Sequence, residues 1–413
     1  MNTLDSDISL VSQREASAEK AGALLWVSFF ICFFCNVCAG LISTLMPSYL
    51  PTVVKDLSAS GDIPRISAII NALYIAGWTI GGFTWGFISD KIGRVKALAL
   101  SVGSFGMLTM LISASSSWEW VVAVRLLSGF AVGGILVITP TLLSEIWPSK
   151  TRSVMLGIDS IGFPVGIFST GIVTYLVNDW RSAFFVGAVP MAIGVISIWG
   201  LKESDNWKNA RLTQKIKSAP DPSLTPNLIK GSIIFGSMLI GLWGMFSWIP
   251  SWVQSLGATS AQDAVTAGLK ESGIAMMLLG AGGLTGGFIS GWVSDALGVR
   301  RAMLLCFSGC FVVSFLLFGV NKHISPIAYT ELAMLSLFFG ISQGLLSIYI
   351  PQLFPYQLRG TYTGICFNIG RIVTALAVFF VGVVVTALGG YSNALLMFAG
   401  IFIIGFVFIY LTK

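Results

Sequence analysis

The sequence predicts an all-α integral membrane protein with twelve transmembrane helices in two related halves. Hydrophobic residues make up 55% of the chain and charged residues 10%, whereas a soluble domain carries roughly 25% charged residues. The apolar residues fall into long runs, and one glycine-rich motif occurs twice. Lipid tolerates an apolar exterior that water does not. The composition therefore excludes a soluble domain.

A helix needs about 20 mainly apolar residues to cross a bilayer. Twelve segments satisfy this: 22–49, 64–88, 96–115, 119–146, 152–177, 182–200, 229–256, 271–294, 301–320, 327–352, 358–387 and 391–411. A polar tail over 1–21 precedes them and lacks the pattern of a cleaved signal peptide. The longest polar stretch, 201–228, divides the spans six and six. We expect an N-terminal bundle over 22–200 and a C-terminal bundle over 229–413.

The distribution of lysine and arginine predicts the orientation. With the N-terminus inside, 17 of the 24 basic residues fall in cytoplasmic segments and 6 on the opposite side. Cytoplasmic segments of membrane proteins carry this excess. We therefore expect both termini, the tail and the central loop to be cytoplasmic, in a plasma membrane or bacterial inner membrane. The basic residues report topology and need no nucleic-acid partner.

The reactive residues exclude several kinds of chemistry. His323 is the only histidine, so neither a histidine metal cluster nor a Ser-His-Asp set is expected. The six cysteines lie inside apolar runs, where free cysteine packs as a small hydrophobic residue. The sequence contains no Gly-x4-Gly-Lys-Ser/Thr motif, the phosphate-binding loop that would indicate ATP binding. We expect no cofactor, no metal and no enzymatic activity.

An internal repeat relates the two halves. The motif Gly-Gly-Phe-x2-Gly-x2-Ser-Asp-x2-Gly at 81–93 recurs at 286–298, an offset of 205, and Pro148-x3-Arg152 recurs as Pro355-x3-Arg359. Two copies with one orientation imply parallel repeats about an axis along the membrane normal.

Two features of the repeated motif make local predictions. Small residues one turn apart let helix backbones approach in lipid, so Gly82-x3-Gly86 and Gly287-x3-Gly291 predict close helix packing. Asp90 and Arg94 flank a tight loop, where an acid and a base can pair in one conformation and separate in another. Such a charge latch would act as a gate.

The sequence resembles the major facilitator superfamily over nearly its whole length. The motifs that carry the resemblance are Gly86-x3-Asp90-x2-Gly93-Arg94, Arg125-x3-Gly129-x3-Gly133-Gly134, Glu145-x2-Pro148-x3-Arg152, Asn178-Asp179-Trp180-Arg181, Glu203-Ser204-x2-Trp207, Pro351-Gln352-Leu353-Phe354-Pro355-x3-Arg359-Gly360-Thr361 and Asn368-Ile369-Gly370-Arg371. The resemblance implies the major facilitator fold and transport by alternating access. Its later motifs are most similar to metabolite:proton symporters, and sugar porters share several of them.

The resemblance also implies a set of gating residues, which are Gly86, Asp90, Gly93, Arg94, Glu145, Arg152, Asp295 and Arg359. Two departures weaken the second half of this set. Gln352 stands where the family pattern has an acid, and Val299 stands where the first half has Arg94. We expect the stronger charge latch in the N-terminal half.

Charged residues inside the spans are the clearest pointers to function, because charge in lipid is costly. Arg371 lies about 20 Å into its span, near the midplane. It is expected to bind an anionic substrate, although a structural ion pair is an open alternative. Asp159, about 10 Å deep, is a candidate proton carrier or a partner of loop bases. Arg125 matches the residue that partners a first-helix acid in relatives, but Asn36 stands at that place and cannot titrate.

Uncharged side chains complete the predicted substrate site. We expect Asn36, Trp243, Gln343, Tyr349 and Asn368 to line a central site together with Arg371, since midplane polar and aromatic groups suit a small ligand. The alternative for each is helix-packing contact.

The predicted function is proton-coupled transport of a small carboxylate or related metabolite by alternating access. The alternative is a sugar or polyol porter, including a facilitator, and a transporter-like sensor is less favoured. The expected partners are a small-molecule substrate, protons and the lipid bilayer, and we expect a monomer.

Overall fold

The computed structural model describes residues 2–58, 62–201, 203–204, 222–257, 262–355 and 359–411. At 2–21, 153, 222, 262–264 and 359–361 it describes the backbone alone. Most of the predicted loop over 201–228 therefore lies outside the described residues.

Every regular element in the described part of the chain is a helix. In order they are α1 (Asn2–Leu57), α2 (Ile63–Ile92), α3 (Arg94–Ser113), α4 (Trp118–Ile146), α5 (Arg152–Leu176), α6 (Trp180–Ala183), η1 (Phe184–Gly187), α7 (Ala188–Gly200), η2 (Pro222–Leu224), α9 (Thr225–Phe246), α10 (Ile249–Leu256), α11 (Gln262–Leu297), α12 (Val299–Gly319), α13 (Pro326–Gln352), α14 (Arg359–Ala387), α15 (Tyr391–Ala399) and α16 (Ile401–Leu411).

Among the described residues, twelve helical segments are long and apolar enough to cross a membrane, as predicted. Three of these spans are interrupted. The sixth, Trp180–Gly200, contains α6, η1 and α7, the seventh contains α9 and α10, and the last contains α15 and α16. Pro250, in the first turn of α10, contributes to the break after α9, because proline cannot donate the backbone hydrogen bond of a continuous helix.

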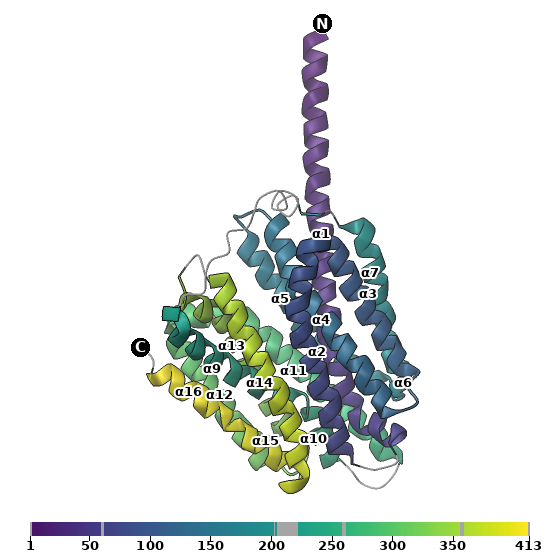
Figure 1. Ribbon diagram of the computed structural model, residues 1–413, viewed down its shortest axis with the longest axis vertical. Coiled ribbons are helices and arrows are strands. Elements are labelled where there is room, and N and C mark those ends of the chain that lie inside the picture. Colours follow the sequence, from purple (N-terminus) through teal and green to yellow (C-terminus); the bar gives the residue numbers. More distant parts are fainter. Residues whose placement is uncertain are drawn as a thin grey trace.

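The first helix is longer than predicted at both ends. The predicted span ended at residue 49, but α1 continues through Pro47 and Pro51 to Leu57. Membrane helices can contain such prolines because neighbouring helices supply hydrogen-bond partners for the backbone groups that proline leaves unpaired. Towards the N-terminus, α1 extends beyond the bundle as a single helix (Figure 1).

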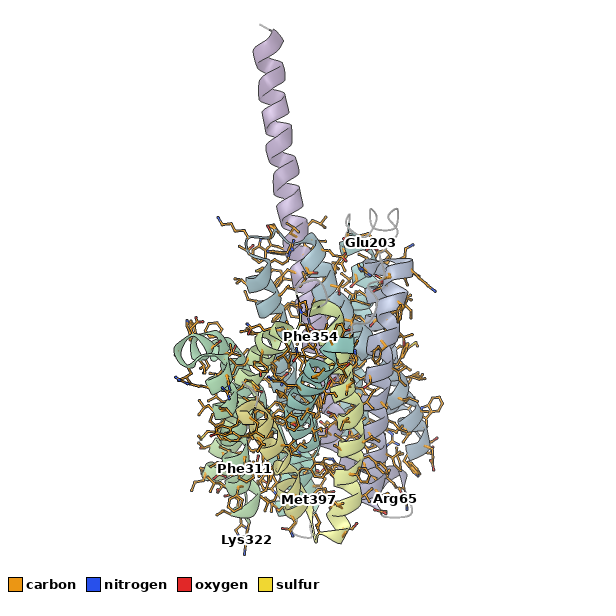
Figure 2. All side chains as sticks on the ribbon, turned by 60° about the vertical axis from the view of Figure 1, so that its left-hand side comes forward. Arg65, Glu203, Phe311, Lys322, Phe354 and Met397 are labelled. Atoms are coloured by element: carbon orange, nitrogen blue, oxygen red, sulfur yellow. The ribbon has the colours of Figure 1, made fainter. Side chains whose placement is uncertain are left out.

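The helices form two halves that lie side by side (Figure 1). Elements α1–α7 make one half and α9–α16 the other; the limits 22–200 and 229–413 remain predictions. We call the end of the molecule that carries the α2–α3 connection and the N-terminal extension the terminal face, and the opposite end the distal face. Figure 2 shows Glu203 near the terminal face and Arg65 and Lys322 at the distal face.

Glycines on α2 allow its backbone to pack directly against the backbone of α4. A Cβ atom at Gly77 would overlap the carbonyl oxygen of Leu126, and one at Gly81 would overlap that of Phe130. Such contacts are how small residues pack helices in lipid.

The second half repeats this packing between α11 and α13. Cβ atoms at Gly282 and Gly286, each 205 residues after its counterpart, would overlap the carbonyl oxygens of Ala333 and Leu337. The internal repeat therefore extends from sequence to packing.

The predicted close packing at Gly82-x3-Gly86 and its repeat holds only for the backbone of the first glycine of each motif. A Cβ at Gly133 of α4 would lie 2.5 Å from the nitrogen of Gly82, and one at Gly340 of α13 would lie 2.8 Å from that of Gly287. In the described part of the chain, no atom of a neighbouring element lies within 4 Å of a Cβ built at Gly86, Gly287 or Gly291, and a Cβ at Gly82 would make only ordinary contacts of 3.7 Å. The packing glycines lie one and five residues earlier in the chain, a shift of about 100° per residue around the helix.

The two halves meet closely towards the distal face. On α5 and α11, a Cβ at Gly273 would lie 2.8 Å from the carbonyl oxygen of Gly171. Nearby, the amide of Gln254 donates a 2.8 Å hydrogen bond to the carbonyl of Ser48. At the terminal face, in contrast, the ribbons of the two halves diverge (Figure 1).

Candidate functional site

Three aromatic rings from both halves meet at mid-height. The ring centroids of Trp78 on α2 and Trp243 on α9 are 5.2 Å apart, and Phe163 on α5 lies 6.1 Å from each. The indole Nε1 of Trp78 is buried and finds no acceptor among the described residues. The aromatic cluster of Trp78, Phe163 and Trp243 thus joins the halves and offers one unused hydrogen-bond donor.

Arg371 on α14 faces this aromatic cluster. Its guanidinium carbon lies 5.8 Å from the Trp78 ring centroid, and Nη1 donates a 3.4 Å hydrogen bond to Oδ1 of Asn368. Gly82 leaves room for both side chains, because a Cβ there would lie 3.7 Å from each. None of the ion pairs in the described part of the chain involves Arg371. A guanidinium so placed can grip a carboxylate with two parallel hydrogen bonds.

The structure brings Asn36 and Asp159 together. The Asn36 amide donates to Oδ2 of Asp159 at 2.9 Å and to Oγ1 of Thr139 at 3.2 Å. Both side chains are buried, and Oδ1 of Asp159 has no hydrogen-bond partner among the described residues. Asp159 therefore forms no ion pair with a base in the part of the chain that the structure describes.

Arg125 lies apart from this pair. Thr139, at the level of Asn36, is 14 residues further along α4, which is about 21 Å of helix. The Arg125 guanidinium is fully buried and stacks 3.6 Å from the ring centroid of Tyr74, whose hydroxyl is 2.6 Å from that of Ser43. Its three nitrogens have no hydrogen-bond acceptor in the described structure.

The two remaining candidates lie on α13. The amide nitrogen of Gln343 is buried and finds no acceptor among the described residues. Tyr349 is six residues further along, about 9 Å closer to the terminal face. Its ring lies 5.8 Å from Nζ of Lys230 on α9. Tyr349 is thus on the terminal side of the aromatic cluster.

The predicted latch residues of the N-terminal half meet at the terminal face. Arg94 donates to Asp90 at 2.7 Å and to Glu145 at 3.1 Å. The Glu203 carboxylate accepts the backbone N–H groups of Arg94, at 2.8 Å, and Val95, at 3.2 Å. An acid at a helix N-terminus is favourable because the helix dipole is positive there. The latch thus ties α2, α3 and α4 to the residues after α7.

The other predicted gating residues make different contacts. Arg152 donates from two nitrogens to the carbonyl of Trp147, at 3.1 Å each, and so binds the end of α4. Gly93 has φ 104°, and its repeat counterpart Gly298 has φ 77°, a region that favours glycine. The side chain of Arg359 lies outside the described residues.

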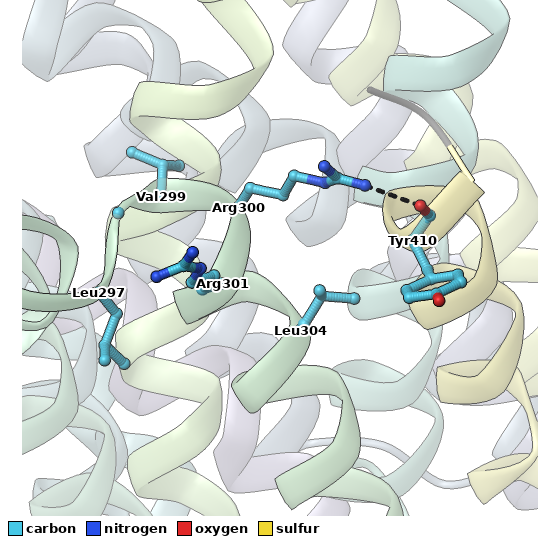
Figure 3. Close-up of a pocket in the computed structure, with 7 residues that line it drawn as sticks. Leu297, Val299, Arg300, Arg301, Leu304 and Tyr410 are labelled. Carbon is cyan, nitrogen blue, oxygen red and sulfur yellow. Dashed lines mark hydrogen bonds between the residues drawn. The ribbon is translucent and has the colours of Figure 1, made fainter.

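The latch is not repeated in the described part of the second half. Asp295 is exposed and forms no ion pair there. Arg300 instead donates to the carbonyls of Ile409 and Tyr410, at 3.2 and 2.7 Å, and so binds the last turn of α16. Figure 3 shows the bond from Arg300 to Tyr410 beside a surface pocket, which is lined by Leu297, Gly298, Val299, Arg300, Arg301, Leu304 and Tyr410. This pocket lies at the start of α12, away from the aromatic cluster.

Asp179 explains one departure from the family motif. It stands where the pattern has glycine and caps α6, accepting the N–H of Ser182 at 2.9 Å and its hydroxyl at 2.6 Å. These bonds lower the pKa of the Asp179 carboxyl below its usual value.

Phe163 was not among the site residues predicted from the sequence. Its signal was its position four residues after Asp159, because residues i and i+4 share one face of a helix. Phe163 also packs its carbonyl against Gly40 of α1.

The fold and this interface define a class of protein. Two parallel repeats of six membrane helices, with polar and aromatic groups between them at mid-height, are the architecture of a secondary transporter. The chain belongs to the Major Facilitator Superfamily, whose family model matches residues 32–378.

Characterised relatives agree with this class. A cis,cis-muconate transport protein of Acinetobacter baylyi is 25% identical over 87% of both chains. The glucose transporter GlcP of Staphylococcus epidermidis is 26% identical over 76% of this chain and 79% of its own. A D-xylose-proton symporter shares the fold with a TM-score of 0.75 at 16% identity, over 94% of this chain and 97% of its own. The chain is therefore a multi-pass membrane transporter of small molecules and not an enzyme.

Proposed function

We propose that this transporter carries a small organic carboxylate by alternating access, coupled to protons. The observation that carries the proposal is Arg371, a cation at mid-height that faces Trp78 and has no acidic partner among the described residues. Charge at that depth is costly, so it marks a substrate site by default. A bound carboxylate would supply the missing counter-charge.

The surrounding groups suit such a substrate. Arg371 and Asn368 would bind the carboxylate, while Trp78, Phe163 and Trp243 would contact its carbon skeleton. The unused donor of Trp78 would bind a second acceptor on the ligand. The muconate transport protein supports the proposal, since muconate is a small dicarboxylate.

The conformation supports the transport mechanism. We propose, from the excess of basic residues, that the terminal face is cytoplasmic. The halves are in contact near the distal face and diverge at the terminal face (Figure 1), which corresponds to an inward-facing state of a monomer in a bacterial inner or plasma membrane. Rocking of the halves about Arg371 and the aromatic cluster would expose the site to the other side. Arg94, Asp90 and Glu145 would form part of the terminal gate.

Asp159 is the proposed proton carrier, because it is a buried acid near the mid-height site without a basic partner in the described structure. Arg125, about 21 Å away along α4, would act in coupling only through the distal packing around Tyr74.

Reconstituted protein provides the test. Proteoliposomes should accumulate labelled cis,cis-muconate when the outside is more acidic, and labelled glucose should not enter above the rate of empty liposomes. Glucose uptake without muconate uptake would contradict the proposal. Muconate uptake that ignores the pH gradient would contradict its proton-coupled part.

The second candidate is a sugar or polyol porter. The unpartnered amide nitrogen of Gln343 favours it, since such a group binds hydroxyls, as does the likeness to GlcP. The same uptake measurement decides between the two substrates.

A further inference from the structure

We infer that Asp159 on α5 is the acid that couples transport to protons and that Asn36 on α1 holds it in position. We further infer that the two side chains can be swapped between these positions without loss of function. The inference rests on the proposed proton coupling and adds a role for Asn36. Its structural basis is a hydrogen bond of 2.9 Å from the Asn36 amide to Oδ2 of Asp159. We call these two residues the 36–159 pair.

The hydrogen bonds of the 36–159 pair fix the orientation of the acid. The Asn36 amide nitrogen faces three acceptors: Oδ2 of Asp159, Oγ1 of Thr139 at 3.2 Å and the carbonyl of Cys32 at 3.4 Å. These contacts hold one carboxylate oxygen in place. The other, Oδ1, is buried without a partner in the described structure and is the atom left to take a proton.

Among the described residues, the groups around Asp159 supply no fixed positive charge. The titratable groups that interact with it from α1 are the thiols of Cys32 and Cys35. From α4 its neighbour is the neutral Thr139. The stretch of α11 between Gly273 and Gly291 contains no titratable residue. Lys270 of α11 lies 6.0 Å from the ring of Tyr175, which is 16 residues, or about 24 Å, from Asp159 along α5. A permanent ion pair would hold the carboxylate charged. Without one, the group is free to bind and release a proton.

Backbone contact between α1 and α5 holds the 36–159 pair in register. A Cβ at Gly40 would overlap the carbonyl of Phe163, and one at Gly166 would overlap that of Val37. A Cβ at Gly162 would lie 3.0 Å from the Cβ of Asn36. Because the helices cannot shift and Asp and Asn have the same shape, exchanging the two residues should preserve the packing.

The same helix connects the pair to the proposed substrate site. Phe163 is one turn beyond Asp159 on α5 and belongs to the aromatic cluster. Protonation forms one O–H bond at Oδ1 with a proton from water on the open side, and release reverses it. No other reactant is needed.

The first test needs no substrate. Infrared difference spectra of the purified full-length protein between two pH values should show the C=O band of one buried carboxylic acid. Asp159→Asn should remove the band, and the double variant Asn36→Asp/Asp159→Asn should restore it. Glu331→Gln removes another acid, whose carboxylate accepts the Asn321 amide at 2.6 Å, and should leave the band unchanged.

The second test uses cis,cis-muconate as the probe in proteoliposomes. Asp159→Asn should lose at least tenfold in accumulation driven by a pH gradient but keep muconate counterflow, which needs no net proton movement. The double variant should regain accumulation. A purely structural role for Asp159 would reduce both activities together.

The outcomes separate this inference from the proposed function. A band that persists in Asp159→Asn, or a folded double variant without the band, would overturn the inference. Wild-type protein with the band but without muconate counterflow would contradict the proposed substrate alone. If Asp159→Asn does not fold, Asn36→Ala keeps the acid and removes its donor. The band should then shift, and an unshifted band would also overturn the inference.

Discussion

The guanidinium of Arg371 lies 5.8 Å from the ring of Trp78, across the boundary between the two halves. Arg371 belongs to α14 and Trp78 to α2, so rocking of the halves would change this distance. The affinity for a substrate bound by both residues would therefore depend on the conformation of the transporter. This relationship makes the centre of the molecule, and not either bundle alone, the proposed site.

Substitution by alanine should lower the stability of the protein at one glycine of α2 and leave it unchanged at the next. Gly81→Ala would drive a methyl group into the carbonyl of Phe130, so we expect a loss of stability of about 1–3 kcal/mol or more. Gly82→Ala would make contacts of 3.7 Å and should be tolerated. Chemical unfolding of the purified variants in detergent measures the difference.

The repeat provides the control for that pair. Gly286→Ala should destabilise α11 against α13, and Gly287→Ala, with no atom within 4 Å, should not. Equal stability of Gly81→Ala and Gly82→Ala would contradict the packing described for α2 and α4.

Part of this architecture follows from the sequence because its cause is local. Twelve apolar runs and the offset of 205 residues predicted the spans and the repeat, since the length of a span is set by the bilayer. The face of α2 that packs on α4 was predicted only in part. Gly82-x3-Gly86 and Gly77-x3-Gly81 have the same spacing, and only the position of α4 distinguishes them.

The contact between α5 and α11 should keep the distal side closed. Even a Cβ at position 273 would lie only 2.8 Å from the Gly171 carbonyl oxygen, so the larger side chain of Gly273→Leu must push the two helices apart. Asn71→Cys, a buried position whose amide reaches the Ser247 carbonyl at 3.5 Å, should then react about tenfold faster with a water-soluble maleimide.

Two controls accompany the labelling. The native cysteines are buried and should contribute little to the reaction. Gly291→Leu, on the same helix at a position with open space, should leave the rate unchanged. An unaltered rate in Gly273→Leu would show that this crossing does not close the distal side.

The terminal latch should show energetic coupling. The side chains of Arg94 and Glu145 are only 10% and 19% exposed, so a double-mutant cycle with Arg94→Gln and Glu145→Gln should give about 1 kcal/mol or more. The pair Arg181 and Asp56, at 41% and 45% exposure, is the control. Water screens that pair, and we expect less than about 1 kcal/mol. Equal coupling in the two cycles would refute a special role for the latch.

The site was only partly predictable for a physical reason. Depth along a helix follows from counting, so Asp159 could be placed about 10 Å into its span and Arg371 near the middle of the membrane. Which side chains meet depends on how the helices are rotated and paired. The contact of Asn36 with Asp159 and the stacking of Arg125 on Tyr74 come from that arrangement. Phe163 was not predicted because its side chain has no polar atom.

The most direct test of the account is muconate counterflow by Arg371→Gln. Two charge-assisted hydrogen bonds are worth about 3 kcal/mol or more, so the apparent affinity for muconate should fall at least about 100-fold. Arg181→Gln, which removes an exposed arginine at the distal end, should keep wild-type affinity. Wild-type affinity in folded Arg371→Gln would contradict the proposal that this arginine binds the substrate carboxylate.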